Sequence, residues 1–344
     1  MPKQAPERSR LTLADVAASL GVSRTTVSNA FNRPEQLSKE LREEILSRSR
    51  ELGYYGPDTM ARALRRRELR EVAVVFHHDL RYAFSDELSL DFLRGVTRQL
   101  DERGLSLQLI PKLGRQLLLQ AAFQTTADAL IVHAEIGPEV VPQVQAAHKP
   151  IVLVDTQVPG TPSVCLDDRQ GAALAMGHAL AAQPDAVVVV AFPQDDAERA
   201  RALGPDPARS PFITSERLSG YAQALRERGF DERRVVWAHV DEGEPEAAAL
   251  QAVQAARAAL GPHRRLALVA MSDRMALAAR GAMLDWPGHA LVAAVGFDDI
   301  AAARQAGLTT VRQNAVAKGE TAVRVVLDGA PSALLPLELI VRET

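Results

Sequence analysis

From residue 72 onward the chain alternates between short apolar runs and longer segments whose apolar residues have helical spacing. Such alternation is typical of parallel sheets covered by helices on both faces. It occurs twice in tandem, which predicts two doubly wound subdomains with a ligand crevice at the carboxyl ends of their strands. The predicted strands are VAVVF (72–76), LSLQLI (105–110), ALIVH (129–133) and IVLVD (151–155), then AVVVVAF (186–192), RVVWAHV (234–240), LALVAM (266–271) and LVAAVGF (291–297). The predicted helices lie near 88–103, 114–125 and 138–148, then near 214–229, 245–260 and 273–285.

The N-terminal segment has a different pattern, of three short amphipathic helices. Thr12 and Asp15 have the spacing of a capping box at the start of the first helix. Gly21 ends that helix, Ser23 caps the second, and Ser38 caps the third. Their inward-facing residues are Val16, Ala17 and Leu20, then Val27 and Phe31, then Leu41, Ile45 and Leu52. Two short helices joined by a tight turn, with a third that closes a small core, form the helix-turn-helix arrangement.

The outward face of the second helix carries compact polar groups and no acids. Its residues are Arg24, Thr25, Ser28, Asn29 and Asn32. Because phosphate oxygens repel carboxylates, such a face suits a helix that enters the major groove of DNA. A small helical domain that binds another protein is the alternative on this pattern alone.

Charge is distributed unevenly along the chain. Residues 1–70 carry 14 Lys and Arg against 9 Asp and Glu, whereas the rest of the chain carries 26 against 34. A basic segment on an acidic body favours contact with a polyanion. The longest apolar run is far shorter than the ~18 residues of a membrane span. The N-terminus lacks the apolar region of a signal peptide, so we expect a cytoplasmic protein without membrane contact.

The segment TLADVAASLGVSRTTVSNAFN (12–32) closely resembles the N-terminal motif of the LacI/GalR family of bacterial repressors, approximately T-x-x-D-V-A-x-x-A-G-V-S-x-x-T-V-S-x-x-L-N. The resemblance implies sequence-specific binding to double-stranded DNA, with Arg24, Thr25 and Asn29 reading bases. The phosphate contacts that it implies are Thr12, Thr26, Ser28 and Asn32. Many family members have arginine where Asn29 stands. Arginine pairs best with guanine and asparagine with adenine, so we expect an altered operator base there.

The stretch YGPDTMARALRRR (55–67) resembles the hinge of that family, in which a proline and an asparagine precede a short helix ending in A-R-x-L. Asp58 stands in place of the asparagine and is expected to cap the helix. A helix this short is marginal in water, and its arginines, Arg62 among them, repel one another. DNA would neutralise the arginines and accept Leu64 as a wedge between base steps of the minor groove. Alternatively, Leu64 packs against the first helix of the body.

Motifs in the rest of the chain resemble the LacI/GalR core, which shares the fold of periplasmic sugar-binding proteins. They are FLRGV, ADALIV, PIVLVD, SERLSGYAQAL, SDRMALAA, AVGFDDI, LTTVRQ and LPLELIVRET. The resemblance implies three crossings between subdomains, near Asp167, Arg312–Asn314 and Pro331–Leu334. We therefore expect a helix-turn-helix domain at 1–56, a hinge at 57–70 and an effector-binding and dimerisation core at 71–344. Subdomain one would comprise about 71–167 and 314–330, and subdomain two about 168–312 and 333–344.

The same resemblance implies an effector site at the strand ends of this core. The residues that it assigns to the effector are Phe84, Ser85, His133, Asp155, Arg217, Ser272, Asp273 and Asp298. An arginine fork and several carboxylates suit the hydroxyls of a sugar through charge-assisted hydrogen bonds. Each residue has a structural alternative: Asp273 and Asp298 would cap the helices that follow them, and Arg217 would pair with an acid. The loop 77–95 is longer than is usual in the family, which leaves the register of Phe84 and Ser85 open.

Other classes of protein fit the sequence less well. An enzyme is disfavoured because the chain lacks the nucleotide-binding, nucleophile-elbow and zinc-protease motifs, so no cofactor or metal is expected. The adjacent His77, His78 and Asp79 are interpreted as solvated loop residues, and Cys165 as part of the core. We expect a homodimer on a pseudo-palindromic operator, because one head covers one half-site. We expect a dimer rather than a tetramer, because no leucine heptad follows the last predicted strand. A regulator that binds DNA without responding to a ligand remains the alternative.

Overall fold

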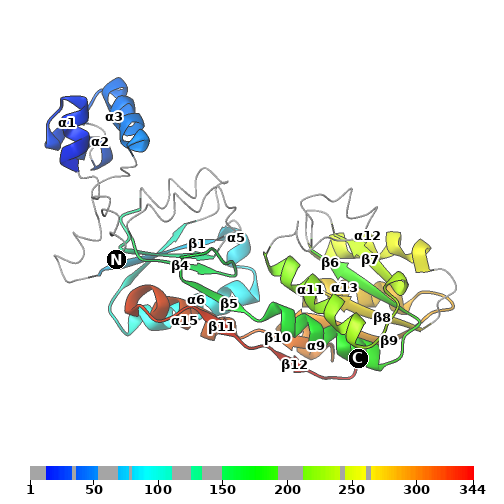
Figure 1. The fold of residues 1–344 in the computed structure, drawn as a ribbon. Helices are drawn as coiled ribbons and strands as arrows, with labels where there is room; N and C mark the ends of the chain where they lie inside the picture. Colours follow the sequence, from blue (N-terminus) through cyan, green and yellow to red (C-terminus); the bar gives the residue numbers. More distant parts are fainter. Residues whose placement is uncertain are drawn as a thin grey trace, which may run out of the picture.

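The computed structural model describes residues 13–32, 36–52, 69–76, 80–110, 125–133, 149–192, 212–240, 245–260 and 265–344. Its elements form a helical head and two lobes, each built on its own sheet (Figure 1). The three predicted head helices are present as α1 (Leu13–Leu20), α2 (Arg24–Asn32) and α3 (Lys39–Glu51). The architecture is therefore an all-α head followed by an α/β core.

Local chemistry fixes the ends of the head helices as the sequence predicts. Gly21 separates α1 from α2 at φ +65°, a conformation that favours glycine. The Ser23 hydroxyl accepts a hydrogen bond from the Thr26 amide at 3.0 Å, and the Ser38 hydroxyl accepts one from the Leu41 amide at 3.3 Å. Both serines therefore cap their helices. The core of the head contains Val16, Ala17, Val27, Ala30 and Ile45.

Two six-stranded sheets form the lobes, and their neighbouring strands are parallel except for β10 and β12. The first lobe has the strand order β11-β5-β4-β3-β1-β2, and the second has β12-β10-β9-β8-β6-β7. The first sheet contains β1 (Glu71–Phe76), β2 (Ser106–Ile110), β3 (Ala129–His133), β4 (Ile151–Val154), β5 (Ser163–Leu166) and β11 (Ala333–Leu335). The second contains β6 (Ala186–Ala191), β7 (Val235–His239), β8 (Arg265–Ala270), β9 (Ala290–Asp298), β10 (Thr309–Arg312) and β12 (Glu338–Ile340). All eight strands predicted from the sequence are confirmed.

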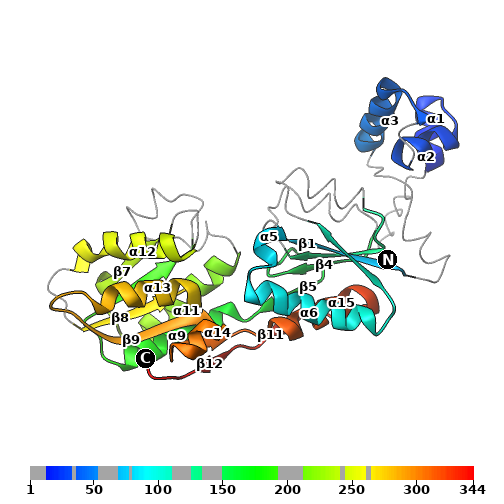
Figure 2. The same cartoon turned by 180° about the vertical axis from the view of Figure 1, so that it is seen from behind.

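Helices cover both sheets (Figures 1 and 2). The first lobe has α5 (Leu80–Ala83), α6 (Glu87–Asp101) and α15 (Ala315–Asp328). The second has α9 (Asp168–Ala181), α11 (Phe212–Glu227), η3 (Glu232–Arg234), α12 (Pro245–Ala256), η4 (Arg257–Leu260), α13 (Asp273–Leu284) and α14 (Ala301–Gln305). The sequence predicts α6, α11, α12 and α13 but does not identify α9 and α15. Its predicted helices near 114–125 and 138–148 lie almost wholly outside the described residues.

The helices α6 and α15 approach each other unusually closely. A Cβ atom at Gly95 would overlap the carbonyl oxygen of Val316, and one at Gly319 would overlap that of Phe92. The two glycines therefore allow backbone-to-backbone contact between the helices, and any side chain at either position would force them apart.

The chain passes between the lobes three times. It leaves β5 for α9 at Asp167 and leaves β10 for α15 at Gln313–Asn314. The third crossing lies at Pro336–Leu337, so the predicted crossing at Pro331–Leu334 is wrong. The reason is that β11 (Ala333–Leu335) pairs with β5 and so extends the first sheet, which also corrects the expected start of the last part of subdomain two at 333.

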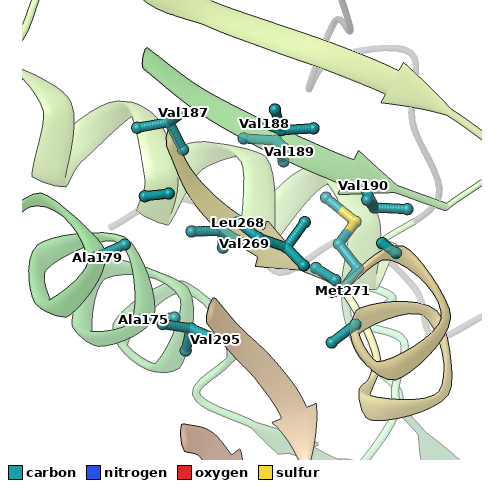
Figure 3. Packing of buried hydrophobic residues seen from close by; sticks show 14 of the residues in the cluster. Ala175, Ala179, Val187, Val188, Val189, Val190, Leu268, Val269, Met271 and Val295 are labelled. Carbon is teal, nitrogen blue, oxygen red and sulfur yellow. The ribbon is translucent and has the colours of Figure 1, made fainter. Parts of the chain in front are cut away.

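Small and branched side chains fill the core of the second lobe. Figure 3 shows Ala175 and Ala179 of α9 beside Val295 of β9, with the valines of β6 and Leu268 of β8 close by. The alanines let α9 lie flat on the sheet, because they add little bulk between helix and strands. Among the described residues, none of the helices has the length and apolar character needed to cross a membrane.

Candidate functional site

The exposed face of α2 carries the residues that the sequence assigns to DNA. Arg24 and Thr25 are exposed, whereas Ser28 and Asn29 are half-buried. The side-chain amide of Asn29 donates to the side-chain oxygen of Gln36 at 2.9 Å. Gln36, which follows α2, thus positions the side-chain amide of Asn29. The sequence pattern did not identify this contact.

Not every predicted DNA contact can be placed. Thr12, Arg62 and Leu64 lie outside the described residues, as does the predicted hinge helix. Asn32 ends α2, and nothing beyond its backbone is described. The Thr26 hydroxyl lies 2.8 Å from the Ser23 hydroxyl, so it also takes part in capping α2.

A first charged cluster lies at the carboxyl edge of the first sheet. His133 ends β3 and Asp155 follows β4. His133 Nε2 lies 2.9 Å from Asp155 Oδ2, and Lys318 Nζ on α15 donates to the same oxygen at 2.5 Å. The side chains of His133, Asp155 and Lys318 are 10%, 8% and 6% exposed, so solvent has little access to the cluster.

Burial and pairing act in opposite directions on this first cluster. Burial acts to raise the pKa of Asp155, but Lys318 and His133 outweigh it and hold that pKa well below its usual value. Burial lowers the pKa of His133 by more than Asp155 raises it, so the imidazole is neutral at pH 7. The rings of Phe92 and Phe76 lie 4.6 and 5.6 Å from the imidazole, centroid to centroid. The cluster is therefore a carboxylate–ammonium pair beside a neutral histidine.

A second charged cluster lies at the carboxyl edge of the second sheet. Arg217 on α11 is 3% exposed and donates through Nε to Asp168 Oδ1 at 2.7 Å. Its guanidinium also donates to the carbonyl of Met271 and stacks 3.6 Å above the ring centroid of Phe297. Burial raises the pKa of Asp168, although Arg217 opposes the shift. Arg217 is thus held by three contacts, with Asp168, Met271 and Phe297. Its pairing with Asp168 is the structural alternative that the sequence left open for this arginine.

Asp298 ends β9 beside this ion pair and adopts φ +130°, which is rare for a residue with a side chain. Its Oδ1 accepts a hydrogen bond from Gln313 Nε2 at 2.6 Å. Burial and the nearby carboxylate of Asp273 raise the pKa of Asp298 well above its usual value. We refer to Asp168, Arg217 and Asp298 together as the second cluster.

Asp273 and Ser272 have structural roles. Asp273 has no exposed surface, and its carboxylate accepts hydrogen bonds from the Thr310 hydroxyl at 2.6 Å and the Ile300 amide at 3.0 Å. The Ser272 hydroxyl caps α13 by accepting from the Met275 amide at 3.2 Å. Their polar atoms therefore join β10, α13 and the start of α14, while a contact with the effector stays a prediction for both residues.

The two lobes touch through residues that the sequence did not identify. The guanidinium of Arg274 donates to the Tyr82 hydroxyl at 3.4 Å. The carboxylate of Glu87, at the start of α6, accepts from the Ala301 amide at 2.9 Å and from Arg304 at 3.1 Å. These contacts bring the carboxyl edges of both sheets to one interface, between the two halves of the core (Figure 1).

The loop 77–95 contains Phe84 and Ser85, which the resemblance assigns to the effector. Phe84 is 55% exposed, and the hydroxyl of Ser85, also exposed, donates to the Tyr82 carbonyl at 3.0 Å. Asp86 lies nearer the interface: it caps α6 through the Ser89 amide at 2.8 Å, and its charge acts on the pKa of both His133 and Asp298. Tyr82 and Asp86 therefore belong to the candidate site, while the structure gives Phe84 and Ser85 no contact with either cluster.

The site is suited to binding rather than to covalent chemistry. Cys165 is buried, and burial raises the pKa of its thiol to about 11, so the thiolate is scarce at pH 7. The described residues contain no group of three or more His, Cys, Asp or Glu that could hold a metal ion. Buried acids and cations at the facing ends of two parallel sheets form the ligand-binding arrangement of open α/β folds.

Comparison with known proteins identifies both parts of the chain. Residues 12–56 match the family described as bacterial regulatory proteins, lacI family, and residues 196–344 match the periplasmic binding protein-like domain. The chain is 34% identical to an HTH-type transcriptional regulator of Mycobacterium tuberculosis, with 97% of this chain and 95% of the relative covered. A second HTH-type transcriptional regulator, from Mycolicibacterium smegmatis, is 33% identical, with 98% and 95% covered. The solved structure of the transcriptional regulator CelR with cellobiose matches with a TM-score of 0.66 and 25% identity, over 97% of this chain and 99% of CelR.

Proposed function

Because the chain belongs to the LacI family of bacterial regulatory proteins, we propose that it is a repressor whose affinity for its operator is set by a small molecule held between the two lobes. Family membership makes the chain a DNA-binding transcriptional regulator and not an enzyme. Control by a ligand is supported by one observation above all. Each lobe brings a buried charged cluster to the interface between them.

The head supplies sequence recognition in this proposal. Arg24, Thr25 and Asn29 read base edges, and Thr12, Thr26, Ser28 and Asn32 hold phosphates. The support is the exposed, acid-free face of α2 together with the family match over 12–56. The hinge at 57–70 then delivers Arg62 to the backbone and Leu64 to the minor groove.

Two copies of the chain bind together in this proposal. A helix-turn-helix head covers one half-site, so a two-fold dimer matches a pseudo-palindromic operator. The dimer is expected to form through the core, and the protein to act in the cytoplasm. Mass measurement in solution at micromolar concentration tests the dimer, and a stable tetramer would contradict it.

The ligand in this proposal is a small polyhydroxylated molecule. Asp155 and His133 contact it from the first lobe, and Arg217 and Asp298 contact it from the second. Of these groups, Asp155 and Arg217 are ionised, and ionised groups form stronger hydrogen bonds to hydroxyls than neutral groups do. CelR, a relative in fold and sequence, has been solved with the disaccharide cellobiose, which supports a sugar-like ligand.

Switching follows from differential affinity. A ligand that contacts both lobes favours the lobe arrangement in which both sets of contacts form, and it can shift the equilibrium by no more than that preference. The hinges emerge from the first lobe, so the arrangement of the lobes sets the separation of the two heads. Coupling of this kind typically amounts to about 1–3 kcal/mol, a factor of roughly 5–150 in DNA affinity.

The experiment is operator binding with and without ligand. Operator fragments recovered by genome-wide mapping of bound sites are titrated by fluorescence anisotropy against the wild-type protein and Asp298→Asn. We expect the same operator affinity for both proteins without ligand, and a ligand response in the wild type alone. A full response in the variant removes Asp298 from the site, and the absence of any response in the wild type identifies a constitutive repressor.

A further inference from the structure

Gln36, which lies between α2 and α3, contacts a side chain that is proposed to read a base. Its side-chain oxygen Oε1 accepts a hydrogen bond from Nδ2 of Asn29 at 2.9 Å. Gln36 is exposed and Asn29 is half-buried, so water competes for both amides. The hydrogen bond therefore contributes little to the folding stability of the free head.

Both ends of this hydrogen bond lie on fixed backbone. Asn29 belongs to α2, whose inner side forms part of the head core. Gln36 immediately precedes Leu37, which packs against that core, and Ser38, whose hydroxyl caps α3. Because the backbone is held on either side, pairing the two side chains costs less conformational entropy than it would in a free loop.

The direction of the hydrogen bond fixes the orientation of the Asn29 amide. A free asparagine amide can turn over and exchange the positions of its oxygen and nitrogen, because the two groups have similar size. The Gln36 oxygen can only accept, so it holds the Asn29 nitrogen towards itself. In the described part of the chain, this leaves the Asn29 oxygen and the second N–H of its amide for another partner.

One acceptor and one donor on the same amide match adenine. In the major groove adenine presents a donor beside an acceptor, whereas guanine presents two acceptors and cytosine a donor alone. Thymine presents an acceptor beside a methyl group. A fixed amide discriminates better than one that can turn over, because it has no second orientation with which to donate to the acceptors of guanine or thymine.

We propose that Gln36 is a positioning residue for base recognition: it holds the amide of Asn29 in the orientation that reads adenine and does not contact a base itself. This inference rests on the proposed function, because it requires that Asn29 reads a base. It adds to base recognition a residue outside the helix that the sequence pattern assigns to DNA.

The test measures base preference with the full-length protein. Anisotropy titrations at one salt concentration compare operators that carry each of the four bases at the position where Asn29→Ala relaxes preference. We expect the wild type to favour adenine there by about 5–150-fold. Gln36→Ala should lower this preference by roughly 2–12-fold, the equivalent of one hydrogen bond. In the Asn29→Ala background, Gln36→Ala should lower it no further, because Gln36 acts through Asn29.

Three results would overturn the proposal. The first is a wild-type preference for a base other than adenine. The second is an unchanged preference in Gln36→Ala, and the third is a further loss in the double variant, which would show that Gln36 reads DNA directly.

Two more variants separate positioning from general attraction to DNA. Gln36→Glu keeps an acceptor for Asn29 but adds a negative charge, so it should keep the adenine preference while weakening binding to every sequence. Gln36→Lys can only donate, so it should lose the preference as Gln36→Ala does, while strengthening binding to every sequence. A preference that follows overall affinity instead would contradict the proposal. Glu40→Ala removes an exposed acid in the first turn of α3, controls for charge alone, and should leave the preference unchanged.

The readouts separate this inference from the proposed function. If no operator position loses its base preference in Asn29→Ala, the proposed role of Asn29 fails, and this inference fails with it. If Asn29→Ala relaxes the preference and Gln36→Ala does not, this inference alone fails. Melting temperatures of the free proteins are expected to be unchanged, which shows that each variant is folded.

Discussion

Replacing Arg217 with methionine should destabilise the second lobe severely, because it strands a buried acid. Asp168 is 2% exposed and Arg217 3% exposed, so water cannot solvate the carboxylate after the change. Methionine keeps most of the length of the side chain and its packing on Phe297, so the perturbation is mainly electrostatic. Breaking a buried pair by removing one partner typically costs about 3–5 kcal/mol. That is a large part of the ~5–15 kcal/mol that holds a domain folded.

Urea unfolding, followed through the fluorescence of Trp237 and Trp286 in the second lobe, measures this cost. The double variant Arg217→Met with Asp168→Asn is the control, since a pair replaced by neutral groups of similar size is often close to neutral. It should recover most of the stability lost by Arg217→Met alone. Urea unfolding also shows whether Arg217 variants remain folded. This must be known before a changed ligand response of such a variant is assigned to the ligand site, because loss of the fold would change the response too.

The pH dependence of the loss has a defined sign. The folded-state pKa of Asp168 is already raised by burial, against the partial opposition of Arg217, and without Arg217 it should rise further. When the folded-state pKa of a carboxylate lies above its unfolded value of about 3.9, the group increasingly destabilises the fold as pH rises from the unfolded pKa to the folded one. Below the unfolded pKa it does not affect stability. The penalty of Arg217→Met should therefore shrink on acidification. A loss below about 1 kcal/mol at pH 7, or one that grows on acidification, would refute the reasoning.

Further predictions concern the head, the hinge and the first lobe. Asn29→Ala should relax sequence preference, at about 1–3 kcal/mol for the lost base contact, while Ser28→Ala weakens binding to operator and random DNA alike in anisotropy titrations. Gln36→Ala should repeat part of the Asn29 effect, and equal losses on both DNAs would contradict it. Leu64→Ala should reduce operator bending in a gel assay without changing the melting temperature of the free protein, whereas a large thermal shift would place this leucine in the core. Gly319→Ala should cost about 1–3 kcal/mol in urea, because its methyl group forces α15 away from α6.

The sequence predicts eight strands of the core, whereas the helices α9 and α15 were not identified, for different reasons. Buried parallel strands are continuous apolar runs, such as 186–192, which few other structures produce. The helix α9 is rich in alanine and glycine on several faces, so it shows little of the amphipathic spacing that marks a surface helix. The helix α15 does show amphipathic spacing, so the pattern was present in the sequence and the interpretation missed it. In α9, small residues on several faces remove the periodic signal that sequence interpretation uses.

The candidate site was predicted in part. Arg217 was located through its place in a motif, and His133 and Asp155 through the ends of their strands. Their partners, Asp168 and Lys318, come from α9 and α15, distant segments that only the three crossings bring close. One member of each pair can be recognised from sequence, Asp155 in the first and Arg217 in the second, but the identity of its partner requires the tertiary structure. Asp273, which the family pattern assigns to the ligand, makes buried hydrogen bonds to Thr310 and Ile300, and its contact with a ligand stays a prediction.

The late position of the edge strands has a consequence for synthesis of the chain. Both sheets receive their last strand on one side from residues 333–340, as β11 pairs with β5 and β12 pairs with β10. The ribosome releases the chain from its N-terminus at about 5–20 residues per second, so most of each sheet exists before either strand does. Until then β5 and β10 present unpaired N–H and C=O groups, which are templates for pairing with other chains. A nascent chain stalled before residue 333 should therefore depend on chaperones at two edges at once, and release of a few more residues should end that dependence for both lobes together.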